Sequence, residues 1–241
     1  MPASPALPAT PPEKRRYVRA MFEGVAPTYD LLNRVLSLNV DRSWRREAIA
    51  RLDWEARPDG VYLDACAGTL DLARSLAQRP GFRGRVVATD FALPMLRVGA
   101  AKLNGERVYS AAADTLELPI RKGAFDGALV GFGVRNLADL AAGLAELARV
   151  LKPGARLVIL DFATPRSTLL RALYLFYFRR VLPVVGRLVS GHPTAYTYLP
   201  ESVMTFPDPE ALTRTLAEAG LTGVGCRRMT GGIVAISWGA R

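Results

Sequence analysis

From about residue 60 onward, short apolar runs of strand length alternate with segments whose apolar residues recur at helical spacing. This alternation is the sequence form of βαβ units, in which a helix carries the chain back between parallel strands. It predicts a doubly wound α/β fold. The predicted strands are Val61–Ala65, Arg85–Asp90, Arg107–Ala112, Phe125–Gly131, Arg156–Phe162, Thr222–Met229 and Gly232–Trp238, and the predicted helices are Asp71–Arg79, Met95–Leu103, Leu140–Leu151 and Pro209–Ala219.

The domain organisation follows from length and local composition. A chain of 241 residues has room for one α/β domain with a sizeable core. Residues 1–12 alternate Pro with small residues and are expected to form a disordered tail. Residues 13–241 are expected to form a single domain, with a helical cap at 13–56 and a lid or substrate segment at 168–205.

The cap and the lid differ in character. The cap is predicted to hold two amphipathic helices, Glu13–Val25 and Arg42–Leu52, joined by the segment Ala26–Asp41. The lid segment Thr168–Val189 is almost wholly apolar and aromatic, but it contains four arginines and Pro183. Because adjacent arginines cost several kcal/mol inside a bilayer, we predict no membrane span there.

The chain is basic, with a formal net charge of +10. An acidic lipid surface, nucleic acid and simple solubility all compete to explain this charge. The basic residues are scattered, and no basic strand carries interleaved aromatic residues, so we predict no nucleic-acid partner. Two cysteines, Cys66 and Cys226, and the lone His192 predict neither a disulfide framework nor a metal site. No secretory signal is evident at the N-terminus, so a cytoplasmic location is expected.

The turn after the first predicted strand is the most informative segment. Asp64 lies near the end of an apolar strand, and Gly68 and Thr69 follow in a run of small residues that opens a helix. Small residues let the backbone approach a ligand closely. Ala67 and Leu70 stand where a glycine-rich loop would have glycines, so an ordinary strand-to-helix turn is the alternative.

An aspartate lies at the end of the second strand, and another follows shortly after the third. Asp90 ends the second strand, 26 residues after Asp64, where a carboxylate can accept hydrogen bonds from ribose hydroxyls. Asp114 and Thr115 follow the third strand and are suited to an adenine edge, although Asp114 could instead cap a turn. A cofactor without phosphates, such as S-adenosylmethionine, tolerates a turn with few glycines better than NAD does.

The chain resembles the ubiquinone/menaquinone biosynthesis C-methyltransferases over nearly its whole length. The most specific match is Tyr29-Asp30-Leu31-Leu32-Asn33-Arg34-Val35-Leu36-Ser37 followed by Trp44. It fits the pattern Y-D-x-M-N-x-x-[aliphatic]-S-x-x-x-H-x-x-W, with departures at Leu32 and at Asp41, which stands at the histidine position. Further matches are Gly131-Phe132-Gly133-Val134-Arg135-Asn136, Arg149–Ala163 with Ala155, Asp161 and Ala163 for Gly, Glu and Ser, Tyr198–Ser202, and Thr230–Ala235.

The resemblance implies a class I S-adenosylmethionine-dependent methyltransferase, whose Rossmann-like sheet of seven strands has an antiparallel last strand. It implies that Thr69, Asp90, Asp114 and Thr115 contact S-adenosylmethionine, and that Asp64, Gly68 and Gly131 line the same pocket. Where many family members have glycine, this chain has Leu70, so that side chain must point away from the methionine moiety.

The proposed catalytic residues are Arg135, Tyr29 and Asp30. Methylating an aromatic carbon requires the neighbouring hydroxyl to lose its proton. Arg135, after the fourth strand, could stabilise the resulting phenolate, or it could be a surface arginine paired with Asp139. Tyr29 and Asp30 could orient the quinol or simply serve the cap. The lone histidine is expected to be an exposed bystander.

The implied substrate is a polyprenylated quinol, most directly demethylmenaquinol, which would be converted to menaquinol. A benzoquinol, another small molecule, or a non-catalytic cofactor- or RNA-binding role are the alternatives. The segment Thr168–Val189 would form a groove for the prenyl tail or an interfacial lid, or else a helix packed on the sheet. Peripheral association with the inner, anionic face of the membrane is therefore expected, and homo-oligomerisation is left open.

Overall fold

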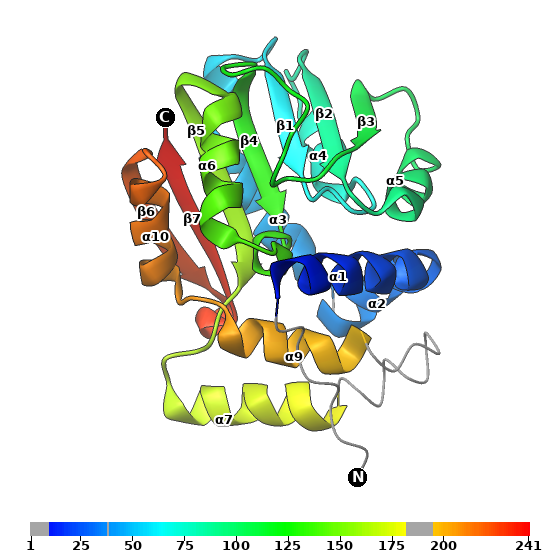
Figure 1. Ribbon diagram of the computed structural model, residues 1–241, viewed down its shortest axis with the longest axis vertical. Coiled ribbons are helices and arrows are strands. Elements are labelled where there is room, and N and C mark those ends of the chain that lie inside the picture. The colour runs from blue at the N-terminus through cyan, green and yellow to red at the C-terminus, as the bar shows by residue number, and fades with distance from the viewer. Residues whose placement is uncertain (1–9, 38, 182–194) are drawn as a thin grey trace.

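The computed structural model describes residues 10–37, 39–181 and 195–241. At its centre is a twisted seven-stranded sheet with the order β3-β2-β1-β4-β5-β7-β6 (Figure 1). All neighbouring pairs are parallel except the two that involve β7. The strands are β1 (Val61–Ala65), β2 (Arg85–Asp90), β3 (Val108–Ala112), β4 (Phe125–Gly131), β5 (Leu151–Phe162), β6 (Thr222–Met229) and β7 (Val234–Ala240). The predicted doubly wound sheet with an antiparallel last strand is confirmed.

Helices cover both faces of the sheet. Leu144 and Leu147 of α6 and Leu212 and Leu216 of α10 pack on one face. Helices α3, α4 and α5 bury Trp44, Leu72, Leu96 and their neighbours on the other face. These residues recur every three or four positions, so each helix turns one apolar side to the sheet. The helices are α3 (Asp41–Arg51), α4 (Asp71–Ala77), α5 (Leu93–Ala100), α6 (Leu140–Val150) and α10 (Pro209–Glu218).

The strand order reverses between β1 and β4. The chain moves outward from β1 to β2 and β3, then returns to pair β4 on the other side of β1. Loops that leave adjacent strands in opposite directions open a crevice at the carboxyl ends of those strands. The turns after β1 and β4 therefore face each other.

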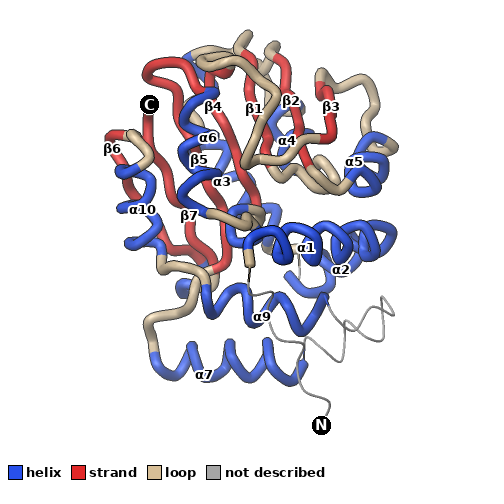
Figure 2. Tube along the Cα trace, viewed as in Figure 1, coloured by secondary structure: helices blue, strands red, loops and turns tan. Residues whose placement is uncertain are grey.

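The remaining helices lie below these carboxyl ends, as Figure 2 shows. They are α1 (Pro11–Val25), α2 (Tyr29–Ser37), α7 (Thr168–Phe176), which continues as a π-helical turn at Tyr177–Val181, and α9 (Ala195–Thr205). Short 3₁₀ turns occur at Ala26–Thr28, Trp54–Ala56, Val134–Asn136 and Thr230–Gly232. The site is thus enclosed between the sheet edge and a helical layer.

Several predicted helix and strand ends differ from the observed ones by one to three residues. Helix α1 begins at Pro11, inside the predicted tail of residues 1–12; Thr10 caps this helix, and proline is favoured in a first turn. The joining segment Ala26–Asp41 is itself mostly helical. Strand β5 begins at Leu151 and bulges over the next residues, since Phe125 pairs with Leu151 but Gly127 pairs with Arg156. The lone histidine and the middle of the predicted lid, residues 182–194, lie outside the described residues.

Candidate active site

The turn between β1 and α4 has an unusual backbone. Cys66, Gly68 and Leu70 all have positive φ, at 51°, 52° and 64°. The amide of Gly68 donates to Asp90 Oδ2 at 2.9 Å, and the amide of Ala67 donates to the Thr89 carbonyl. The backbone of this turn is thereby fastened to the end of β2, and its open side faces the crevice.

Leu70 points into the core. Its side chain is fully buried in the cluster between the sheet and α4, as the sequence required. A left-handed conformation costs a non-glycine residue about 1–2 kcal/mol, and burial of the leucine offsets that cost. Gly99 of α5 makes the space, because a Cβ there would lie 2.4 Å from Leu70 Cγ and 2.7 Å from the Thr69 carbonyl carbon.

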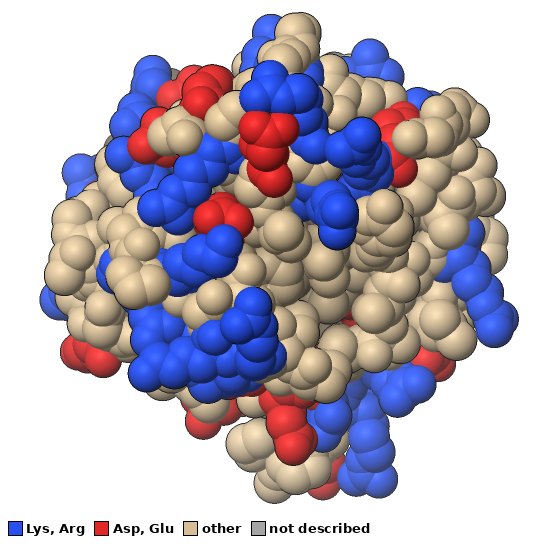
Figure 3. Space-filling view, turned by 90° about the horizontal axis from the view of Figure 1, so that it is seen from above, with Lys and Arg blue, Asp and Glu red and all other residues tan. Residues whose placement is uncertain are grey.

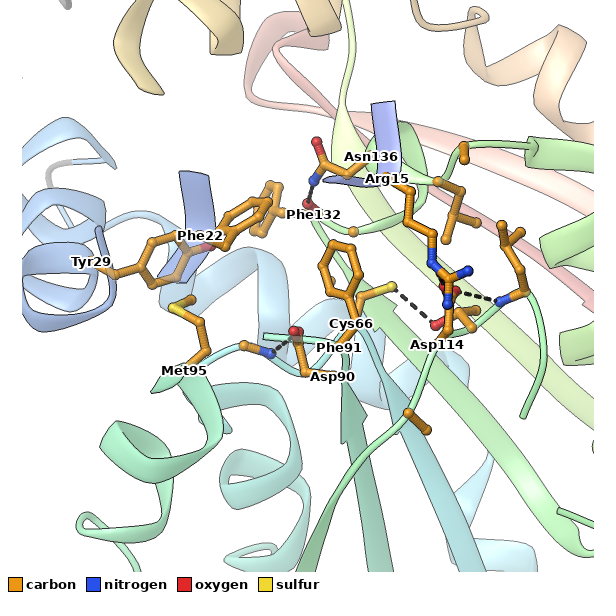
Figure 4. A pocket seen from close by; sticks show the side chains of 18 residues that line it. Arg15, Phe22, Tyr29, Cys66, Asp90, Phe91, Met95, Asp114, Phe132 and Asn136 are labelled. Carbon is orange, nitrogen blue, oxygen red and sulfur yellow. Dashed lines mark hydrogen bonds and ion pairs between the residues drawn. The ribbon is translucent and has the colours of Figure 1, made fainter. Parts of the chain in front are cut away.

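Asp90 lies at the mouth of a pocket that Figure 4 shows from close by. Its second carboxylate oxygen accepts from the Ala92 amide at 2.8 Å. Burial raises the pKa of Asp90, and the backbone donors oppose that shift. Phe91 and Met95 add apolar surface beside it. The pocket can therefore take a flat, apolar group next to a hydrogen-bond acceptor.

Asp114 and Thr115 lie on the opposite side of this pocket. Asp114 Oδ1 accepts from the Leu116 amide at 2.9 Å, which is the turn role that the sequence left open. Asp114 Oδ2 lies 2.5 Å from Arg15 Nε of α1, an ion pair visible in Figure 4. Thr115 is buried, with Oγ1 3.3 Å from Cys66 Sγ. Asp114 thus both shapes its loop and presents negative charge to the pocket.

A second, smaller pocket adjoins the turn and holds two unpaired polar atoms. It is lined by Asp64, Gly68, Thr69, Gly131 and Arg45, among others. Asp64 Oδ2 accepts from the Ala73 amide at 2.8 Å, but Asp64 Oδ1 and Arg45 Nε are buried with no hydrogen-bond partner in the described part of the chain. Burial raises the pKa of Asp64 to about 7. A carboxyl group and a guanidinium that each have an unpaired hydrogen-bonding atom suit a ligand that carries both an ammonium and a carboxylate group.

Arg45 comes from α3 and is fixed by two carboxylates. Its Nη2 lies 3.2 Å from Asp41 and its Nη1 3.3 Å from Asp71. Asp41 also accepts from Ser37 at 2.9 Å. The aspartate at the family's histidine position therefore orients this arginine.

A large, mostly apolar cavity lies between the sheet edge and the helical layer. Its volume is about 320 Å³. Phe22, Tyr29 and Phe132 line both this cavity and the pocket beside Asp90. The rest of its wall is mostly aromatic and aliphatic, and includes Trp44, Phe162, Tyr174, Phe178 and Ile233. A ligand in one pocket and a ligand in the other could therefore contact the same three side chains.

Arg135 is buried at this cavity. Its Nη1 lies 2.7 Å from Asp161 Oδ1, and the guanidinium faces the Phe162 ring at 5.3 Å. The alternative of a surface pair with Asp139 was wrong, because Asp139 caps α6 by accepting from the Ala142 amide. Lys14 of α1 donates to the Arg135 and Leu137 carbonyls, at 3.2 and 2.6 Å, and so holds the turn that carries Arg135.

Tyr29 and Asp30 are neighbours in α2 but point to different places. Tyr29 lines all three pockets, and burial raises the pKa of its phenol. Asp30 lines none of these three. Its oxygens accept from Thr69 Oγ1 at 2.6 Å and Lys102 Nζ at 2.8 Å, so it ties α2 to the turn after β1.

Sequence reasoning did not single out Arg45, Arg15, Lys102 or Tyr174. Arg45 directly follows Trp44 of the family-like segment, which is the one signal that could have pointed to it. The described residues contain no cluster of side chains that could hold a metal ion, and both cysteines are free. Within the same residues no helix combines the length and the apolar character needed to cross a membrane.

The sheet order, the small-residue turn after β1 and the acid that ends β2 define the class: this is a class I S-adenosylmethionine-dependent methyltransferase. The fold agrees with a solved S-adenosylmethionine-dependent methyltransferase from Thermotoga maritima, described as a possible histamine N-methyltransferase. That structure superposes with a TM-score of 0.66 at 16% identity, covering 92% of this chain and 99% of the other.

Sequence comparison narrows the class. The model of the ubiE/COQ5 methyltransferase family matches residues 11–241. A demethylmenaquinone methyltransferase of Thermus thermophilus is 47% identical to this chain, and the alignment covers 92% of this chain and 100% of the relative. A ubiquinone/menaquinone biosynthesis C-methyltransferase of Geobacter sulfurreducens is 41% identical, covering 95% and 90%. The chain belongs to the ubiE/COQ5 methyltransferase family.

Proposed function

We propose that the protein transfers a methyl group from S-adenosylmethionine to a ring carbon of a polyprenylated quinol, with demethylmenaquinol as the substrate and menaquinol as the product. The observation that carries this proposal is the apolar cavity at Arg135, which shares a wall with the cofactor pocket. The family relatives named above as demethylmenaquinone methyltransferases support the choice of a naphthoquinol.

The residues of the two smaller pockets fit the methyl donor. The unpaired Asp64 Oδ1 suits its α-amino group, and the unpaired Arg45 Nε suits its carboxylate. Asp90 would accept from the ribose hydroxyls, while Asp114 and Thr115 would meet the adenine edge. Gly68, Thr69 and Gly131 would line the methionine side. When bound, the donor supplies an electrophilic methyl group on a positively charged sulfur.

Arg135 is proposed to act on the quinol. Its buried guanidinium would stabilise the negative oxygen that forms when the quinol hydroxyl beside the reacting carbon releases its proton. Asp161 holds the guanidinium in place at 2.7 Å and leaves Nε available. The aromatic wall excludes water and keeps the ring flat against the shared wall, so positioning and electrostatics supply most of the rate enhancement.

Tyr29 and Asp30 would then have separate roles. Tyr29 lies on the shared wall and would orient the quinol ring toward the methyl group. Asp30 would position Thr69 and the turn through its hydrogen bond, so its effect on the reaction would be indirect.

The outer face of α7 is proposed to dock on the membrane that holds the quinol. Leu169, Leu173 and Phe176 follow at i, i+4 and i+7, and their exposed fractions are 81%, 63% and 60%. Arg171 and Arg180 are exposed nearby and suit anionic headgroups. The opposite face of the same helix gives Tyr174 to the cavity, so a tail drawn from the membrane would have a short path inward.

A methyl-transfer assay tests the reaction. The full chain is incubated with labelled S-adenosylmethionine and a panel of demethylmenaquinol, demethylated benzoquinol and unrelated small acceptors, and mass spectrometry locates the methyl group. We expect label on the ring carbon of the naphthoquinol. Label on oxygen, or on a non-quinol acceptor alone, would contradict the proposal, and preference for the benzoquinol would correct its substrate.

A further inference from the structure

Three residues that line the large cavity have a buried polar atom without a hydrogen-bond partner in the described part of the chain, and one of the three atoms, Arg45 Nε, is proposed above to bind the carboxylate of the methyl donor. Arg135 Nε and the Tyr174 hydroxyl have no hydrogen-bond partner among the described residues, and both residues line the cavity. A buried donor without a partner costs about 1–3 kcal/mol. Two such donors in a mostly apolar cavity are therefore the features expected of a site built for a ligand with oxygen atoms.

The Tyr174 hydroxyl is held in a fixed relation to Arg135. Tyr174 belongs to α7, is 5% exposed, and packs against Phe178 with ring centroids 4.3 Å apart and ring planes tilted by 42°. Phe178 meets the edge of Phe162 at 6.1 Å, and Phe162 faces the Arg135 guanidinium. This run of ring contacts joins the helical layer to the sheet edge and limits where the hydroxyl can lie.

We propose that Tyr174 donates a hydrogen bond to the second oxygen of a para-dihydroxyarene, the oxygen opposite the one that Arg135 stabilises. The inference rests on the proposed function and adds a specificity-determining residue to it. Arg135 would stabilise the oxygen that becomes negatively charged. Tyr174 would donate a hydrogen bond to the para oxygen and so favour ligands that have one. An arene with one oxygen would leave the hydroxyl unpaired, and sites built to pair a hydroxyl reject ligands that lack one.

The protonation state agrees with a donor role. Burial raises the pKa of the Tyr174 phenol, and the nearby positive charge of Arg135 opposes this only in part. The phenol therefore stays protonated at neutral pH and can donate. Tyr198, another tyrosine of the same cavity, is already bonded to Asn136 Oδ1 at 3.2 Å and leaves this role to Tyr174.

A binding experiment on the full chain separates the two oxygens. The probes are 1,4-dihydroxynaphthalene and 1-naphthol, titrated without oxygen and with S-adenosylhomocysteine present. Quenching of Trp44, which lines the cavity, reports binding, and calorimetry checks it. Tyr174→Phe keeps the ring and removes the hydroxyl. Tyr109→Phe, at a tyrosine that is 57% exposed on β3, is the matched control.

We expect Tyr174→Phe to lower the diol-to-naphthol affinity ratio about 3- to 10-fold, the value of one hydrogen bond, while Tyr109→Phe leaves the ratio unchanged. An unchanged ratio in a folded Tyr174→Phe protein that binds both probes would overturn the role of Tyr174 and leave the proposed function intact. Failure of the unmodified protein to bind either probe would overturn the quinol function itself, and the inference with it.

Discussion

If Asp64 binds the amino group of the cofactor as proposed, cofactor binding should depend on pH. Burial raises the pKa of this carboxyl to about 7, so near neutrality the free protein holds it partly protonated. A cationic amino group binds the ionised form, and binding must then release a proton. We expect affinity for S-adenosylhomocysteine to rise between about pH 5 and pH 8 and then to level off. Calorimetry in two buffers of different ionisation enthalpy measures the released proton.

Asp64→Asn is the control for this prediction, since it keeps the shape and removes the titration. Its affinity should be weaker and nearly independent of pH, and a dependence equal to that of the unmodified protein would assign the proton to another group. The same carboxyl affects stability. Because its folded pKa lies above its unfolded value of 3.8, the folded state binds more protons between about pH 4 and pH 7, so its contribution to the free energy of unfolding declines as pH rises through that window.

Arg135 is expected to act on the transition state. Replacing it alone would leave Asp161 as an unpaired buried charge and destabilise the protein by about 3–5 kcal/mol. The informative variant is therefore Arg135→Met/Asp161→Leu, which removes the pair together. We expect kcat to fall about a hundredfold or more, with S-adenosylhomocysteine affinity nearly unchanged.

Arg135→Lys completes this test. Lysine keeps the positive charge but lacks the planar guanidinium with its paired N–H donors, so this variant should retain part of the activity. A raised KM with unchanged kcat in the double variant would assign Arg135 to substrate binding instead. Melting temperatures of all variants show whether the fold is intact.

Among the elements, helix α5 packs closely against the turn between β1 and α4. A methyl group at Gly99 would lie 2.7 Å from the Thr69 carbonyl carbon as well as against Leu70. Alanine normally stabilises a helix relative to glycine by about 1 kcal/mol, but overpacking against a fixed backbone costs about 1–3 kcal/mol and outweighs it. We expect Gly99→Ala to lower the melting temperature by several degrees and to weaken cofactor binding.

Ala100→Ser, at the adjacent exposed position, is the control and should change the free energy of unfolding by about 0.5 kcal/mol or less. A Gly99→Ala protein more stable than the unmodified one would show that the turn can move away from the helix.

The central strands β1, β4 and most of β5 were predictable because each has a nearly continuous apolar run. Helix α2 was not, because Asp30 and Asn33 favour turns when only local sequence is considered. What stabilises the helix is distant: Asp30 bonds to Thr69 and Lys102, 39 and 72 residues away. The same limit applies to the site. The family pattern indicated Arg135, but its partner Asp161 is 26 residues further on and no spacing rule connects the two.

At the scale of the whole molecule, exposed basic residues occur at both ends, whereas the exposed apolar residues of α7 lie at one end. Figure 3 looks down on the amino-terminal edge of the parallel strands, where basic side chains gather. The exposed apolar residues of α7 lie at the opposite end, below the sheet (Figure 1). Substitutions at each end of the molecule can therefore test which end docks on a membrane.

Leu173→Glu should reduce flotation with anionic vesicles about tenfold or more, because a buried leucine is worth about 1.5–3 kcal/mol in an apolar phase. Arg83→Glu, an exposed change in the turn before β2, should leave flotation unchanged. Loss of flotation with Arg83→Glu but not with Leu173→Glu would mean that the basic end docks instead.

The wall formed by Phe22, Tyr29 and Phe132 has a consequence for ligand design. Because these three side chains line both cavities, a cofactor and a quinol bound as proposed would contact the same side chains and lie close to each other. An adenosine derivative with a prenyl chain attached through sulfur could fill both cavities as one bisubstrate molecule. Tethering makes the second contact intramolecular, so its affinity would exceed that of either half.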